Sequence, residues 1–319
     1  MCMDADFKQE WYGMQAKILK QTDDCMIVDC GIEGRAMITN YFLFDGIQLC
    51  FMDMDTSEVI PSQSFHSDII QITYCREGRY ECEFSNHTVS YLPKGSFGVA
   101  STQYLPIAVS FPLKRCYAVS LVIDKRALSD ATKKILESVS LDPNRIGDNL
   151  GIEDRWYVKQ VPPKLEKLFE ELCEVKDCEQ VGYFKIKAVE LLYNLDQIHQ
   201  AKGCDFKYFD RWQIDTTKEI LRHLEEHLDE KISLESLVKE SDLSLSVFHN
   251  VFSNIYGETP YAYLKKYKMN LAAEMLLEEK RKIGEIALEV GYSNASKFAK
   301  AFESVYGVLP KDYRKTKKV

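Results

Sequence analysis

The C-terminal third of the chain contains an internal repeat, which constrains the fold more than any other feature of the 319-residue sequence. Residues 233–260 align with residues 282–310 at an offset of 49, which becomes 50 after one extra residue in the second copy. Such agreement with a single slip indicates that one structural unit was duplicated. The positions that agree in type are Leu234 and Ile283, Leu237 and Ile286, Val238 and Ala287, Leu243-Ser244 and Tyr292-Ser293, Phe248 and Phe298, Phe252 and Phe302, Gly257 and Gly307, and Pro260 and Pro310.

Each copy predicts two helices separated by a tight turn. The first helix has apolar residues at i, i+3 and i+4, and the turn holds a residue that tolerates a positive φ, Asp242 or Gly291. Ser244 or Ser293 follows as the expected N-cap of a second helix, which buries two phenylalanines four residues apart. This arrangement is typical of a helix-turn-helix, whose second helix enters the major groove of DNA. We therefore predict helix-turn-helix units at 233–254 and 283–306.

A long helix is predicted between the two units. Thr259 supplies an N-cap and Pro260 a proline at the first helical position, and apolar residues spaced by three or four continue to about residue 279. A helix of ~20 residues is about 30 Å long. Successive major grooves on one side of B-DNA lie roughly 34–36 Å apart. The connecting helix, 259–279, can therefore present both units to adjacent major grooves of an asymmetric site.

Three runs in this region match a known family pattern: 233–237 (SLESL), 257–264 (GETPYAYL) and 283–293 (IGEIALEVGYS). With the phenylalanines, glycine and proline that follow, residues 216–314 resemble the DNA-binding domain of the AraC/XylS family of bacterial transcription regulators. The resemblance covers about a third of the chain. It implies seven helices, binding to double-stranded promoter DNA and RNA polymerase as a partner. The sequence departs from the family at Asn250, Lys268 and Lys300, where arginine is common.

The second helix of the first unit, 244–254, contains no lysine or arginine. Asn250 is expected to pair with adenine and Val247 to meet a thymine methyl group. The alternative is that this helix contacts phosphates loosely and specifies little. The predicted DNA-facing residues of this helix are Ser246, Val247, His249, Asn250 and Ser253.

The second unit contributes cations. Ser296, Lys297 and Lys300 are expected on the free face of its second helix, with Lys300 directed to guanine and Lys297 to phosphate. Lys265 and Arg314 are predicted contacts to the DNA backbone. The alternative for each lysine is an ordinary solvated side chain.

The net charge and the cysteine spacing limit which ligands and which cellular compartment the sequence favours. The net charge is −8, but residues 210–319 hold 18 basic and 18 acidic residues, so the excess lies in the N-terminal part and does not repel phosphate from the C-terminal part. The 10 cysteines form no C-x-x-C pair, which leaves a disulfide scaffold or reduced thiols. Since no signal peptide or long apolar run is present, we predict a cytoplasmic protein with reduced cysteines, one of which could sense redox state.

The N-terminal part predicts short strands followed by helices. Two-residue turns at Asp45-Gly46 and Glu77-Gly78 predict hairpins, and residues 79–84 alternate between apolar and charged. Strands at regular spacing favour a small closed or double-sheet β-barrel within 1–124. Helices with apolar stripes follow in 125–204 and either pack on the barrel or dimerise. The DNA-binding domain is assigned to 205–319, and its boundary with the N-terminal part lies within a predicted linker at 203–212. The predicted fold is therefore a two-domain α+β protein.

Strands followed by helices, ahead of such a DNA-binding domain, resemble the cupin-like sensor domain of the same family, which places similar residues at His66, at 70–79 and at Pro93-Lys94-Gly95. This implies a barrel that binds a small effector and helices that form a homodimer. The six histidines supply no metal cluster, so we predict neither a metal, a cofactor nor an enzyme activity. The predicted effector-binding residues, for which core filling is the alternative, are His66, Tyr74, Arg76, Tyr80, Phe84, Phe97 and Tyr104.

Two functional hypotheses follow. The first is a DNA-binding transcription regulator, most simply an activator, that is controlled by a small effector in the barrel. The second is a regulator whose N-terminal domain only dimerises or docks a protein partner, without any small molecule.

Overall fold

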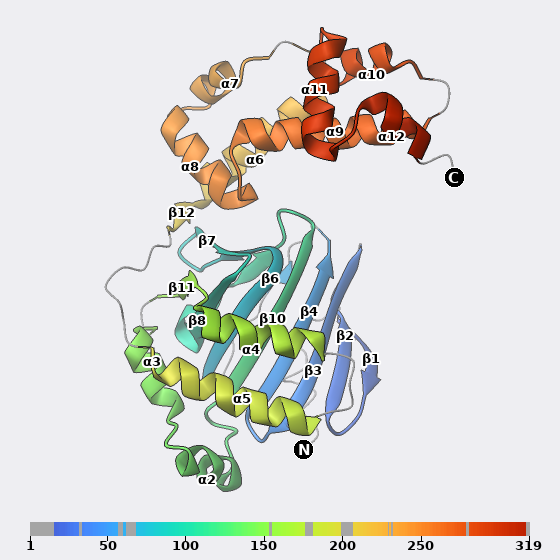
Figure 1. Ribbon diagram of the computed structural model, residues 1–319. Helices are drawn as coiled ribbons and strands as arrows, with labels where there is room; N and C mark the ends of the chain where they lie inside the picture. Colours follow the sequence, from blue (N-terminus) through green and yellow to red (C-terminus); the bar gives the residue numbers. More distant parts are fainter. Residues whose placement is uncertain are drawn as a thin grey trace. The chain divides into compact units, whose positions relative to one another are not determined.

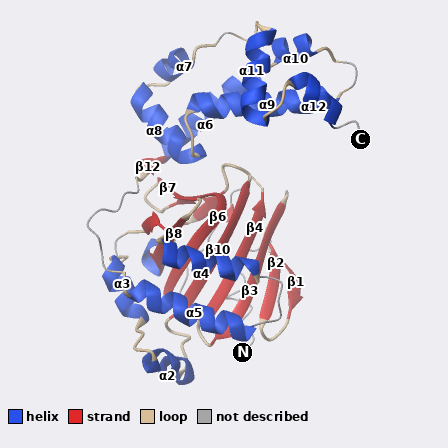
Figure 2. Cartoon of the chain, in the orientation of Figure 1, coloured by secondary structure: helices blue, strands red, loops and turns tan. Residues whose placement is uncertain are grey.

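The computed structural model describes residues 16–31, 34–56, 60–61, 68–152, 155–175, 181–198, 207–228, 230, 232–278 and 281–316. The chain divides into two compact units, Met1–Tyr208 and Phe209–Val319. Strands and then helices make up the first unit, and helices dominate the second (Figures 1 and 2). This order confirms the predicted α+β architecture.

The first unit is built on antiparallel strands. Neighbouring strands pair in the order β1-β2-β3-β4-β10-β6, and β6 also pairs with β7, β8 and β9. The predicted hairpin at Asp45-Gly46 is confirmed, because it joins β3 to β4 with Gly46 at a positive φ of 81°. The strands are β1 (Lys17–Gln21), β2 (Cys25–Asp29), β3 (Arg35–Phe44), β4 (Ile47–Asp55), β5 (Ile60–Pro61), β6 (Ile69–Glu83), β7 (Thr88–Pro93), β8 (Ser96–Ser101), β9 (Ala108–Ser110), β10 (Arg115–Asp124) and β11 (Tyr157–Gln160).

The predicted hairpin at Glu77-Gly78 is wrong. Strand β6 continues through it, pairing with β10 and β8 in its first part and with β7 and β9 in its second. The register with β10 shifts here, and Gly78 has a φ of 77°. A Cβ at Gly78 would lie 1.8 Å from the Arg115 carbonyl oxygen, so only glycine permits this close approach. The glycine marks a bulge rather than a turn.

The sheet carries side chains on both faces. One face, which we call the interior face, holds a buried interior cluster to which strands β2–β4 and β6–β11 contribute. Glu81, which alternates with the apolar residues of 79–84 as predicted, is buried and accepts hydrogen bonds from the hydroxyls of Tyr91 (2.7 Å) and Ser110 (2.8 Å). The interior cluster includes Met26, Val28, Ala36, Met52, Met54, Cys75, Tyr80, Cys82, Phe84, Leu92, Phe111, Cys116, Ala118 and Trp156.

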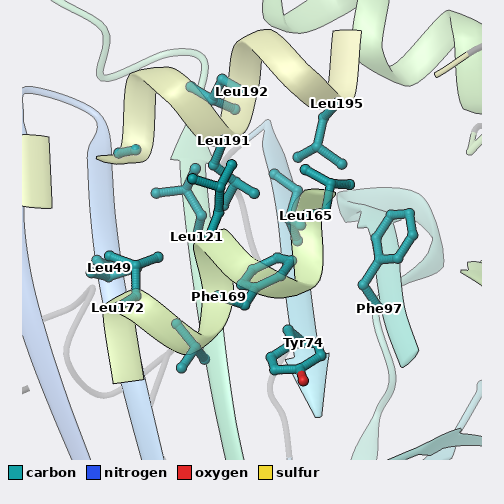
Figure 3. Close-up of a cluster of buried hydrophobic side chains, with 14 of the residues drawn as sticks. Leu49, Tyr74, Phe97, Leu121, Leu165, Phe169, Leu172, Leu191, Leu192 and Leu195 are labelled. Atoms are coloured by element: carbon teal, nitrogen blue, oxygen red, sulfur yellow. The ribbon is translucent and has the colours of Figure 1, made fainter. Parts of the chain in front are cut away.

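Helices cover the other face. Helices α4 (Pro163–Glu174) and α5 (Val181–Asp196) lie across the sheet in Figure 1, and α2 (Asp130–Ser138) and α3 (Pro143–Leu150) precede them. Pro163 stands in the first turn of α4, as predicted from the Pro162-Pro163 pair. Leu165, Phe169 and Leu172 of α4 contact Leu191, Leu192 and Leu195 of α5 and the sheet beneath, forming the helix-side cluster of Figure 3.

The second unit contains a short strand, β12 (Phe209–Asp210), and the seven helices that the resemblance implied within its described residues. The first helix begins at Arg211, inside the segment expected to be linker. The helices are α6 (Arg211–Glu226), α7 (Leu234–Glu240), α8 (Leu245–Tyr256), α9 (Pro260–Leu277), α10 (Ile283–Glu289), α11 (Ala295–Tyr306) and α12 (Pro310–Thr316).

Candidate nucleic-acid interface

The first helix-turn-helix, α7 and α8, forms as its sequence predicts. Asp242 occupies the turn with a φ of 60°, and the Ser244 hydroxyl accepts a hydrogen bond from the Val247 backbone N–H, capping α8. Phe248 and Phe252 are fully buried against α6 and α7. Burial of one face by these rings leaves the opposite face of α8 free to meet a ligand.

The second unit, α10 and α11, repeats this design with one difference. Gly291 occupies the turn with a φ of 81°, and Phe298 and Phe302 are fully buried. The predicted cap, Ser293, is wrong: the Asn294 side chain accepts the hydrogen bonds from the backbone N–H groups of Ser296 and Lys297. The extra residue of the second copy lies in this turn, so the capping position moves one residue along the chain.

The free face of α8 carries only neutral side chains. Ser246 is exposed, and Val247, His249, Asn250 and Ser253 are partly buried at the edge of the same face. Val247 packs against the core that contains Phe248 and Phe252, whereas Ser246, His249, Asn250 and Ser253 are not part of that core. Contact of all five residues with DNA stays a prediction. Amide, imidazole and hydroxyl groups suit hydrogen bonding to base edges rather than neutralisation of phosphate.

The free face of α11 is charged. Ser296, Lys297 and Lys300 are exposed on it, together with Glu303 one turn later. Lys265 is exposed on α9, which joins the two units. The two helix-turn-helix units therefore differ electrostatically, since α11 offers two cations and α8 offers none.

Arg314, a predicted DNA contact, makes hydrogen bonds within the domain. Its Nε donates to the Leu276 carbonyl oxygen at 3.2 Å, and its Nη2 donates to the Arg281 carbonyl oxygen at 2.7 Å. The guanidinium therefore satisfies backbone carbonyls at and after the C-terminal end of α9, where helices leave acceptors without partners. These hydrogen bonds give Arg314 a structural role, and its contact with the DNA backbone stays a prediction.

A polar group beside α8 was not anticipated from the sequence. The Tyr261 hydroxyl at the start of α9 donates to the Glu235 carboxylate on α7, and the Ser233 hydroxyl donates to the same carboxylate at 2.7 Å. These hydrogen bonds, led by Tyr261, lower the pKa of Glu235 to about 2, and nearby His249 acts in the same direction. The signal in the sequence was weak because Tyr261 lies 26 residues from Glu235.

The predicted effector residues do not share one site. Tyr74 and Phe97 belong to the helix-side cluster, where the Tyr74 ring stacks on Phe169 at 4.7 Å (Figure 3). The Tyr74 hydroxyl donates to Glu170 at 3.0 Å, and Glu170 also pairs with Arg76 at 2.8 Å. These contacts hold α4 on the sheet.

The remaining predicted effector residues lie elsewhere. Tyr80 and Phe84 belong to the interior cluster, and Tyr104 packs against it. His66 lies outside the described residues. The expectation of one aromatic pocket is therefore wrong for Tyr74 and Phe97, because these two side chains lie on the opposite face of the sheet.

A polar layer crosses the interior face instead. Asn40, Ser120 and Thr73 lie in one row of paired positions across β3, β4, β10 and β6, with Cys50 between the first two. Strand alternation places them on the same face as the interior cluster. Ser120 and Thr73 share a hydrogen bond of 2.8 Å, whereas the amide of Asn40 is fully buried without a partner, as is the side-chain oxygen of Gln48. We call Asn40, Gln48, Thr73 and Ser120 the interior polar layer.

The cysteines of the described segments are free thiols, and most are buried. Burial raises the pKa of Cys30 to about 12 and places the pKa values of Cys50 and Cys82 well above the ordinary thiol range. Such thiols stay protonated at neutral pH and react slowly. The described residues contain no cluster of histidine, cysteine or carboxylate side chains that could hold a metal ion. None of the described helices is long and apolar enough to cross a membrane.

Two helix-turn-helix units joined by one helix define a DNA-binding domain, and comparisons with known proteins agree. Residues 237–316 match the family profile described as "Helix-turn-helix domain". Relatives include the probable transcriptional regulator LumQ of Photobacterium leiognathi, 30% identical over 33% of this chain and 44% of its own length. Another is the HTH-type transcriptional regulator AlkR of Acinetobacter baylyi, 38% identical over 26% of this chain and 27% of its own length.

A solved structure is similar over the same region. The C-terminal domain of AraT, a response regulator from Geobacillus stearothermophilus, is 28% identical, with a TM-score of 0.31 over 33% of this chain and 87% of that domain. The chain spans less than half the length of LumQ or AlkR. The C-terminal part of this chain is a helix-turn-helix domain of the AraC type, as the resemblance implied. The matched domain is a DNA-binding module and not an enzyme domain.

Proposed function

We propose that this protein is a sequence-specific transcription regulator that binds double-stranded DNA through two adjacent major grooves. The observation that carries this proposal is the pair of helix-turn-helix units packed on the two halves of one helix. The 18 residues of α9 span about 27 Å at 1.5 Å per residue. Helices α8 and α11 each pack against α9, and the proposal requires them to lie about 34 Å apart, the distance between successive major grooves.

The experiment that tests this function is selection of duplexes from a random pool by the full chain. The expected result is an asymmetric site with two short elements whose centres are about 10 base pairs apart, one helical turn. Failure to enrich any sequence, or binding that is equal for all duplexes at low salt, would contradict sequence-specific recognition.

In this proposal the two helix-turn-helix units contact different groups of the DNA. Lys297 and Lys300 of α11 neutralise phosphate or contact guanine, and Asn250 of α8 reads adenine through its amide. Activation follows if the bound protein contacts RNA polymerase. A reporter assay with the selected site upstream of a weak promoter distinguishes an activator, which raises transcription, from a repressor.

We further propose that the helical region of 125–204 forms a homodimer through α5. The support is a pair of exposed apolar side chains on the outer side of this helix, Ile186 (68% exposed) and Tyr193 (49% exposed), opposite its buried leucines. Large apolar side chains that lie together on one helix face favour burial against another surface. Ile186→Glu is expected to convert a dimer to a monomer in sedimentation velocity. Ile135→Glu, at an exposed apolar position of α2, is the matched control and should not change the mass.

The interior polar layer supports control by a small neutral effector. A buried amide without a hydrogen-bond partner costs about 1–3 kcal/mol, and a ligand with donors and acceptors would remove this cost at Asn40 and Gln48. The layer contains amides and hydroxyls only, so the favoured effector is uncharged and polar, in the range of sugars, polyols and amides.

Thermal denaturation of the full chain with monosaccharides, polyols and small amides tests this part. An effector is expected to raise the midpoint temperature of unfolding of the wild type but not that of Asn40→Leu. If no compound of these classes raises the midpoint temperature and Asn40→Leu is more stable than the wild type, the interior polar layer only destabilises the fold and binds no effector. The N-terminal unit then only dimerises or docks a protein partner.

A further inference from the structure

Helix α9 serves two separate cores. Its N-terminal half contributes Tyr263 and Leu264 to the core of the first helix-turn-helix, which also contains Phe248 and Phe252. Its C-terminal half contributes residues from Met269 to Leu276 to the core of the second, which contains Phe298 and Phe302. The two cores share no residue among those described. Apart from α9, the relative angle of α8 and α11 therefore depends on any direct contact between the two modules.

A direct contact joins the two modules at the middle of α9. Gly291, in the turn of the second module, lies against the backbone of Leu228, which follows α6 in the first module. A Cβ on Gly291 would lie 2.1 Å from the Leu228 carbonyl oxygen and 2.7 Å from Lys268 Nζ. The backbones therefore approach as closely as glycine allows, and this requirement adds to the positive φ of the turn.

Lys268 of α9 lies between the two modules at this contact. Its Nζ donates to the Leu228 carbonyl oxygen at 3.3 Å and lies 6.0 Å from the centre of the Tyr292 ring, next to Gly291. The side chain is partly buried, and desolvation lowers the pKa of its ammonium group. A lysine near a helix C-terminus also favours the local dipole of α6. One cation thus touches the first module, the second module and the helix between them.

We propose that Lys268 and Gly291 are positioning residues that fix the angle between the two recognition helices and thereby the spacing of the two DNA elements. The proposal rests on the function proposed above and deepens it. Neither residue needs to touch DNA. Binding of two tethered modules exceeds binding of one by roughly 10²–10⁴ only when the linkage matches the distance between their sites. A loosened junction therefore weakens two-groove binding without weakening either module alone.

The first test measures the junction without DNA. Spin labels on genetically encoded residues at positions 246 and 296 report the distance between α8 and α11 by double electron–electron resonance. The wild type and Lys268→Arg are expected to give one narrow distance, and Lys268→Met a broad distribution. An equally narrow distance in Lys268→Met would overturn the proposal whether or not the chain binds any duplex.

The second test uses the selected duplex, the same duplex with its elements moved by one base pair, and each half-site alone. Lys268→Met is expected to lose about tenfold in affinity for the optimal duplex, to lose discrimination against the altered spacing and to bind half-sites as the wild type does. Lys268→Arg should restore most of the affinity, and Arg222→Met is the charge-matched control on the exposed side of α6.

The outcomes separate the two proposals. Equal losses on the half-sites and on the whole site would show that Lys268 acts on stability or on DNA contact, and would overturn the positioning role. Gly291→Ala should act as Lys268→Met does, and more strongly, because the new Cβ would collide with backbone. If the wild type binds no duplex, the proposed function is refuted. The distance measurement still tests whether Lys268 fixes the angle between α8 and α11.

Discussion

Removal of the two cations on α11 is expected to lower the salt dependence of DNA binding by a calculable amount. Each phosphate contact contributes about 0.9 to the slope of log affinity against log salt. Lys297 and Lys300 are both exposed on the free face of α11, and α8 has no lysine or arginine. If both lysines meet phosphate, Lys297→Gln with Lys300→Gln lowers the slope by about 1.8.

This change of slope is large enough to measure. Between 50 and 200 mM salt, a slope difference of about 1.8 corresponds to a roughly twelvefold smaller loss of affinity in the double variant. Fluorescence anisotropy with the selected duplex over that salt range gives both slopes. Lys133→Gln with Lys134→Gln removes the same charge from an exposed face of α2 in the first unit, and is the matched control.

Three results are distinguishable. A slope lowered by half the expected amount would indicate that one lysine contacts a base rather than a phosphate, which selection with each single variant would then locate. An unchanged slope, or the same change in the Lys133 and Lys134 variant, would refute the placement of α11 against DNA. Loss of folding would appear in the far-ultraviolet circular dichroism spectrum.

The remaining predictions concern the domain itself. Asn250→Ala should reduce preference for adenine at one position by about 1–3 kcal/mol in competition binding, without changing the salt slope. Arg314→Ala should lower the free energy of unfolding of the domain by about 1.5–3 kcal/mol by leaving two carbonyls unpaired, and an unchanged urea midpoint would contradict this. Phe252→Ala should cost about 3–5 kcal/mol in the same assay. The folded-state pKa of Glu235 is lowered from 4.5 to about 2, so its stabilising effect is present above pH 4.5 and is lost as the pH falls toward 2. In thermal denaturation, Glu235→Gln should therefore reduce the fall of the unfolding temperature over this pH range. An unchanged dependence of the unfolding temperature on pH would contradict this.

Local signals in the sequence identified most elements of the DNA-binding domain, although the N-cap of α11 and the start of α6 were misplaced. The repeat, the positive-φ residues Asp242 and Gly291, and the caps Ser244 and Thr259 all describe interactions within a few residues of one another. Such interactions are visible in the sequence because both partners lie in the same turn of helix. The same reasoning identified the hairpin at Asp45-Gly46, where the flanking strands need no distant partner to set their register.

Predictions failed where a distant segment decided between two local possibilities. Gly78 was compatible with a turn or a bulge, and pairing of the whole of β6 with β10 selected the bulge. Tyr74 and Tyr80 were both plausible pocket residues, but the bulge and the alternation of the strand place them on opposite faces of the sheet. No periodicity within β6 alone reveals which face the helices cover.

The sequence by itself determined the class of the C-terminal domain, the positions of its two helix-turn-helix units and the neutral character of α8 against the charged character of α11. Tertiary structure alone decided that Arg314 binds carbonyls at and after the end of α9, that Asn40 is buried without a partner, and that Lys268 lies where the two modules meet. The physical reason is the separation along the sequence of the groups that interact. Caps, turns and amphipathic stripes depend on neighbours in sequence, whereas the role of a long polar side chain depends on which distant backbone folding brings within hydrogen-bonding distance.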